Sequence, residues 1–220
     1  ELGNPVKGAR LYKVEPIDRR KRKVPQKGRR WGWLTRVDVL KIDPETKVEL
    51  LLRSARVWKT QLEDIGRAER SLERIHQQVD STNEAAARAL AEIYQETGDV
   101  EKLSGAYQII LNHQTEPEAR REYQLLLANL HGEVLGDREV AFTWHTQIFT
   151  EDPSRLEDTP ALEAAAGHIE AWPSVVELYR GALGSGVDEE LEIELRMRLA
   201  RVLSEALGQH EEALGELQQI

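Results

Sequence analysis

The strongest constraint on the fold is a two-helix pattern that recurs about every 36 residues along most of the chain. In residues 90–99, apolar side chains lie three and four positions apart, and Gly98 and Asp99 then supply the turn that ends a helix. Residues 103–111 carry a second apolar stripe at helical spacing, and Pro117 follows, a residue that a helix interior does not accept. This stretch therefore predicts a helical hairpin.

Similar hairpins are predicted along residues 48–220. A small residue marks the middle of the first helix in four of the five units, and a small or apolar residue marks the inward face of each second helix. In chain order these residues are Ala55, Ala91, Ala128 and Ala200 in the first helices, and Ala68, Leu103, Ala141, Val175 and Ala213 in the second helices. The fourth unit has a weak first helix, around residues 162–169. Repeats of this length stack into a solenoid, because one unit alone cannot bury its apolar face.

The units resemble the tetratricopeptide repeat (TPR). The residues that carry the resemblance best are Leu90, Ala91, Tyr94, Gly98 and Tyr107 in one unit, and Leu127, Ala128, Gly136, Ala141, Ile148 and Pro153 in the next. The resemblance implies an all-α fold, a right-handed TPR-like helix-turn-helix solenoid of about five hairpins over residues 48–220. It also implies that the repeated positions serve packing rather than catalysis.

The turns inside the units alternate in length. The first, third and fifth units have an extra leucine between their helices, and the second and fourth units do not. These leucines are Leu62, Leu135 and Leu207. We interpret the alternation as a deeper period of two units that arose by duplication of pairs; ordinary drift in loop length is the alternative.

The chain divides by charge into a basic N-terminal segment and an acidic body. Residues 1–47 have 14 Lys and Arg against 6 Asp and Glu, whereas residues 48–220 have 16 against 33. The sequence of residues 1–47 suggests a half-repeat, then a basic irregular stretch and a degenerate repeat. Because the chain opens inside a repeat and ends at Ile220 without a polar capping helix, we expect the array to continue beyond both ends or a partner to cover them.

The basic stretch is a candidate site for a polyanion such as nucleic acid. Its candidate residues are Arg19, Arg20, Lys21, Arg22, Lys23, Lys27, Arg29, Arg30, Trp31 and Trp33. Five consecutive cations cannot be buried, so the run is exposed whether it binds a polyanion, serves as a nuclear-localisation signal or is a solvated loop. Trp31 and Trp33 either stack on bases or pack against the first repeat.

The residue patterns that enzymes and metal sites require do not occur. The chain has no cysteine, which excludes disulfides, thiolate metal sites and a cysteine nucleophile. No two of the six histidines are four positions apart, the spacing that places two imidazoles on one metal ion. There is no glycine-rich phosphate loop and no pair of carboxylates expected to converge in a pocket. We therefore expect no enzyme activity, no metal and no cofactor.

The remaining candidate site is the concave groove that stacked first helices form in TPR proteins. The resemblance implies a groove lined by Leu52, Arg56, Lys59, Arg88, Glu92, Gln95, Leu125, Asn129, Met197 and Arg201. An extended groove suits another polypeptide better than a small substrate. We therefore expect a protein–protein interaction scaffold or adaptor that holds a peptide segment or helix of another protein within a larger chain or complex. The alternative is a nucleic-acid-binding or polyanion-binding accessory subunit that uses Arg19 to Arg30.

The apolar runs of the chain are short. None approaches the ~20 residues of a membrane-spanning helix, so we expect a soluble protein with no membrane span. The compartment is not identified by the sequence, with the cytoplasm slightly favoured. The acidic body repels phosphate groups and anionic lipids, so any binding of nucleic acid falls to the basic stretch.

Overall fold

Residues 42–220 are described by a computed structural model of the protein, and their regular structure is helical throughout. The α-helices are α1 (Pro44–Thr60), α2 (Ile65–Gln78), α3 (Glu84–Thr97), α4 (Val100–His113), α5 (Pro117–Asn129), α6 (Arg138–Glu151), α7 (Thr159–His168), α8 (Trp172–Gly184), α9 (Glu189–Arg201) and α10 (His210–Leu217). Two π-helices, η2 (Leu130–Leu135) and η4 (Val202–Ala206), and one 3₁₀-helix, η3 (Leu156–Asp158), lie between them. The half-repeat, the basic stretch, Trp31 and Trp33 lie outside the described residues.

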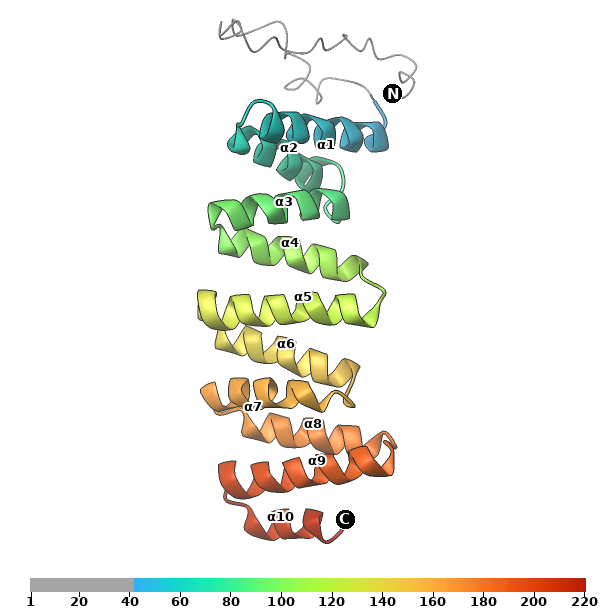
Figure 1. Ribbon diagram of the computed structural model, residues 1–220, viewed down its shortest axis with the longest axis vertical. Helices are drawn as coiled ribbons and strands as arrows, with labels where there is room; N and C mark the ends of the chain where they lie inside the picture. Colours follow the sequence, from blue (N-terminus) through green and yellow to red (C-terminus); the bar gives the residue numbers. More distant parts are fainter. Residues whose placement is uncertain (1–41) are drawn as a thin grey trace, which may run out of the picture. The chain divides into compact units, whose positions relative to one another are not determined.

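Within the described residues the α-helices pair into five successive hairpins: α1–α2, α3–α4, α5–α6, α7–α8 and α9–α10. Each of the first four second helices also packs against the first helix of the following hairpin, so these hairpins stack in chain order (Figure 1). This part of the chain is an all-α, TPR-like solenoid, as the repeat pattern predicts. Among the described residues the first helix, α1, starts at Pro44 with Asp43 as its N-cap, so the first unit includes residues 44–47.

The five hairpin turns have the same backbone design. One residue in each turn has a left-handed conformation, with φ between 54° and 76°: Glu63, Gly98, Gly136, Glu170 and Gly208. The N–H of the next residue donates to a carbonyl near the end of the first helix, at 2.8 to 3.1 Å. These donor and acceptor pairs are Asp64 and Trp58, Asp99 and Tyr94, Asp137 and His131, Ala171 and Ala166, and Gln209 and Leu203. A left-handed residue lets the chain reverse while the last carbonyls of the first helix keep hydrogen-bond donors.

The extra residue of the first, third and fifth units is absorbed as a widened last turn of the first helix. In the third hairpin this turn is η2, and in the fifth it is η4. In the first hairpin, the N–H of Leu62 donates to the carbonyl of Val57, five residues earlier, at 3.2 Å. One inserted residue inside a helix is what a single π turn accommodates. The alternation of turn length is confirmed, and its origin by duplication stays a prediction.

The residues that mark the repeat form the core. All nine are at most 7% exposed, which confirms that the pattern identifies inward positions. The weak fourth unit is complete as well, because α7 buries Leu162 and Ala166 against α8. Trp58 is 5% exposed, and Trp172 packs against the core of the last hairpins.

Glycine at position 170 should stabilise the array, because the left-handed conformation of Glu170, at φ 56°, disfavours a side chain. We expect Glu170→Gly to raise the free energy of unfolding by about 0.5–1 kcal/mol. Gly98→Ala, at φ 76°, should lower it by about 1 kcal/mol. The control Glu177→Gly, inside α8, should also lower it by about 1 kcal/mol.

Chemical denaturation followed by circular dichroism measures all three variants. A loss of stability in Glu170→Gly, similar to that in Glu177→Gly, would contradict the shared turn design.

Candidate functional site

The ten groove residues expected from the sequence all lie on first helices, on the side that faces solvent. Seven of them are exposed: Arg56, Arg88, Glu92, Gln95, Asn129, Met197 and Arg201. The other three, Leu52, Lys59 and Leu125, are half-buried. We call the outward faces of α1, α3, α5, α7 and α9 the first-helix surface. Its two ends, on α1 and on α9, lie at opposite ends of the stack (Figure 1).

Polar side chains connect α1, α3 and α5 across this surface. The ammonium of Lys59 on α1 lies 3.2 Å from the carboxylate of Glu92 and 2.9 Å from that of Glu96, both on α3. The hydrogen bonds to these carboxylates raise the pKa of Lys59, against the opposing effect of burial. Arg88 on α3 donates to the Tyr123 hydroxyl on α5 at 3.1 Å. Three of the expected groove residues therefore meet side chains of a neighbouring first helix.

The link between α5 and α7 is a pair that sequence reasoning missed. Arg121 on α5 donates to both carboxylate oxygens of Asp158, at 2.8 and 2.5 Å, just before α7. Asp158 is 8% exposed, so this ion pair is largely shielded from solvent on its acidic side. A two-pronged contact of this kind fixes the relative orientation of two helices as well as their distance.

Glu163 joins α7 to α9 and was also missed. It accepts from the Tyr179 hydroxyl at 2.8 Å and from Arg201 at 2.6 Å. Burial raises the pKa of Tyr179, so this hydroxyl keeps its proton and acts as the donor. The repeat spacing does contain the signal, because Glu163 lies 35 residues after Ala128, where other units have their small residue.

The surface changes character between α5 and α9. Along its middle the residues are short or apolar: Leu125, Asn129, Pro160, Ala164, Gly167 and Met197. Exposed carboxylates flank these residues: Glu122, Glu133, Glu157 and Glu205. We call the two sets together the α5–α7–α9 strip. Within residues 42–220, Glu122, Glu133 and Glu205 form no ion pair.

The strip ends in a small cleft of about 240 Å³. The cleft is lined by Trp172, Glu163, Arg201, Val202, Glu205 and Ala206. Its walls therefore combine an indole ring with two carboxylates, one of which is already paired with a guanidinium. An aromatic wall beside a free carboxylate can hold the aliphatic stem and the charge of a basic side chain.

Ser104, His131 and Asp137 have the connectivity of a hydrolytic triad but lie in a packed junction. The Ser104 oxygen is 2.8 Å from Nε2 of His131, and Nδ1 of His131 is 3.4 Å from the Asp137 carboxylate. Ser104 is 5% exposed and His131 is 9% exposed, and neither lines the cleft above. A nucleophile needs room for a substrate. We interpret this network as packing between η2 and α4.

No group of three or more His, Asp and Glu residues within residues 42–220 could hold a metal ion. No helix in that range has both the length and the apolar character needed to cross a bilayer.

His145 on α6 should make stability fall in mild acid. Burial lowers its pKa, and its Nδ1 is buried without a hydrogen-bond partner in the described part of the chain. Because the unfolded chain then takes up the proton first, stability is full above about pH 6.5 and is lost as pH falls through the folded pKa. We expect His145→Leu to reduce the loss between about pH 7.5 and 5.5.

Chemical denaturation at the two pH values checks this. The variant His168→Leu, at an exposed histidine, should keep the full loss. Equal pH dependence in wild type and His145→Leu would contradict the assignment.

Comparison with known proteins gives structural neighbours alone. No family model matches the chain, and no curated protein does. Among solved structures, it is similar to a Podosopora anserina putative kinesin light chain with nearly identical TPR-like repeats, at 22% identity and a TM-score of 0.38, over 80% of this chain and 94% of that chain. A variant of that protein matches at 21% identity and a TM-score of 0.36, over 81% and 94%. The described part of this chain is a TPR-like helical-repeat array, as its five stacked hairpins show.

Proposed function

We propose that the chain is a non-enzymatic scaffold that holds a segment of another protein on its first-helix surface. The observation that carries the proposal is the continuity of this surface: side-chain contacts join α1 to α3, α3 to α5, α5 to α7 and α7 to α9. A surface of this kind offers many contact points along one direction, which suits an extended or helical polypeptide. TPR-like arrays generally serve as protein-interaction scaffolds.

The α5–α7–α9 strip is the proposed centre of binding. Of its large apolar residues, Met197 is 42% exposed and Leu125 is half-buried. Between them, Ala164 and Gly167 on α7 have little bulk, so the backbone of a partner can approach closely. Apolar contact in the middle with charge at the rim is the usual composition of a protein interface.

The charge of the strip selects a basic partner. Glu122, Glu133 and Glu205 are exposed carboxylates, and none of them forms an ion pair within the described residues. A partner with Lys or Arg beside its apolar residues gains attraction to this rim, whereas an acidic partner is repelled. We therefore propose a basic amphipathic segment as the ligand class.

A binding titration tests the proposal. The probe is a fluorescein-labelled helical peptide of leucine and lysine, about 15 residues long. The comparison peptide is identical except that glutamate replaces each lysine. Fluorescence anisotropy should show that the lysine peptide binds and that the glutamate peptide does not. The strip variant Glu122→Gln, Glu133→Gln, Glu205→Gln should weaken it about tenfold, since each rim charge contributes up to about 1 kcal/mol. Ala164→Arg, which places bulk and positive charge in the strip, should weaken it at least as much.

The matched control removes the same number of charges from second helices. Glu101→Gln, Glu139→Gln, Glu211→Gln changes exposed residues on α4, α6 and α10. We expect this variant to weaken binding by less than about twofold. Equal weakening by both triple variants would mean that net charge alone attracts the peptide, and the proposal would then be wrong.

The second candidate, binding of nucleic acid or another polyanion, is a proposal from the sequence. It is supported by the charge of residues 1–47 and by the run Arg19 to Lys23, which lies outside the described residues. Its signature would be binding that weakens steeply with salt and requires residues 19–30. Binding on the first-helix surface would persist without them.

A further inference from the structure

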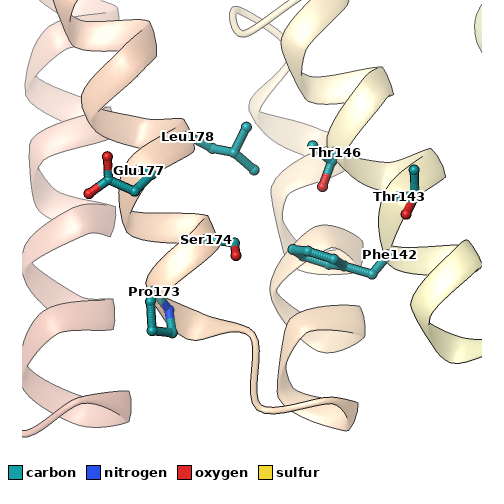
Figure 2. A pocket seen from close by; sticks show the side chains of 7 residues that line it. All are labelled: Phe142, Thr143, Thr146, Pro173, Ser174, Glu177 and Leu178. Atoms are coloured by element: carbon teal, nitrogen blue, oxygen red, sulfur yellow. The ribbon is translucent and has the colours of Figure 1, made fainter.

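A cleft of about 550 Å³ lies between α6 and α8, which are second helices of neighbouring hairpins. Its walls include Phe142 and Thr146 from α6, and Pro173, Ser174 and Leu178 from α8. Figure 2 shows Phe142 and Leu178 extending from the two helices into the space between them. None of these residues belongs to the first-helix surface, so the inference does not rest on the proposed function.

Elsewhere in the array, second helices are joined by an ion pair at one repeated place. Glu73 on α2 lies 3.0 Å from Lys102 on α4. Arg180 on α8 lies 2.9 Å from Glu212 on α10. The two pairs occupy the same positions in the repeat. Glu73 and Arg180 each lie five residues after the inward residue of their helix, which is Ala68 or Val175. Lys102 and Glu212 each lie one residue before the inward residue of the next second helix, which is Leu103 or Ala213.

At the α6–α8 junction the same two positions are Thr146 and Ser174. Two short hydroxyl side chains cannot reach across as a glutamate and a lysine do, so the space between the helices stays open. The α4–α6 junction also lacks the pair, with Gln108 and Val140 at these positions, but both of those side chains are larger. The cleft therefore lies at a junction that lacks the ion pair of the α2–α4 and α8–α10 junctions and has short side chains in its place.

The cleft favours a large apolar side chain with a cation beside it. Phe142, Leu178 and Pro173 give it apolar walls. Glu177 lies at its edge with a side chain that is 78% exposed. The cation closest to that carboxylate among the described residues is Arg180, at 4.0 Å, and Arg180 is held by Glu212 at 2.9 Å. The carboxylate is therefore available to a partner.

We propose that this cleft is a second docking site, for a segment of a partner protein that carries a large apolar side chain next to Lys or Arg. The apolar side chain enters between Phe142 and Leu178, and the cation pairs with Glu177. Charge complementarity is the reason for this choice, since residues 48–220 have 33 acidic against 16 basic residues. An open cleft between two helices encloses one side chain better than a whole small molecule.

Chemical-shift mapping on the full chain tests the site. The probe is N-acetyl-phenylalanyl-lysine amide, and the comparison compounds replace lysine by glutamate or phenylalanine by glycine. We expect the amide signals of Thr146, Ser174 and Leu178 to shift saturably as the probe is added to about 10 mM. Such a high concentration is needed because so small a ligand binds weakly. Both comparison compounds should bind at least about fivefold more weakly.

Two variants separate the two parts of the site. The double variant Thr146→Glu, Ser174→Lys introduces the bridge that the α2–α4 junction has, and we expect it to weaken binding more than about tenfold. Glu177→Gln should reduce the preference for lysine over glutamate to below about twofold while the preference for phenylalanine remains. Glu101→Gln, on α4, is the matched control and should bind as wild type does.

Three results would overturn the proposal. The first is the absence of saturable shifts at the cleft. The second is unchanged binding to the double variant, whose own spectrum reports whether it is folded. The third is an unchanged lysine preference in Glu177→Gln. Because Glu177 and Glu101 are exposed, their variants fold in either case.

Discussion

The fold depends on the packing of each second helix against the first helix of the next hairpin. Each helix of a hairpin has apolar residues on more than one face, and the other helix of the same hairpin covers one of these faces. The contact between α6, α7 and α8 shows how the rest is covered: Phe149 and Tyr179 meet edge to face at 5.3 Å between ring centroids, with Leu162 buried beside them. Stability is therefore shared between neighbours, and the surfaces left over are long and open.

Regular features of the array were accessible from the sequence because they are local. Apolar spacing and Gly98 with Asp99 predict where a hairpin turns, and the extra leucines predict which turns are longer. The left-handed conformation of Glu63 and Glu170 was not accessible, since nothing in those residues favours it and the turn imposes it. The same holds for Glu163, whose position the spacing contains but whose two partners lie 16 and 38 residues away.

The two proposed sites have different physical origins. The α5–α7–α9 strip follows from the repeat itself, because first helices present outward positions that packing does not constrain, and three of its residues, Leu125, Asn129 and Met197, had been expected to line a groove. The α6–α8 cleft follows from a departure from the repeat, since Thr146 and Ser174 stand where the α2–α4 and α8–α10 junctions have charges. The missing ion pair can be recognised only when α6 and α8 are known to be adjacent. Sequence reasoning therefore did not find the cleft.

The central claim is that five hairpins share one turn, and amide hydrogen exchange resolved by residue tests it most directly. The N–H groups of Asp64, Asp99, Asp137, Ala171 and Gln209 each donate to the first helix of their own hairpin. We predict protection at all five, with fast exchange at Ile65 and Val100, which open second helices and have no intrahelical acceptor. Exchange of the five amides as fast as that of Ile65 and Val100 would contradict the account.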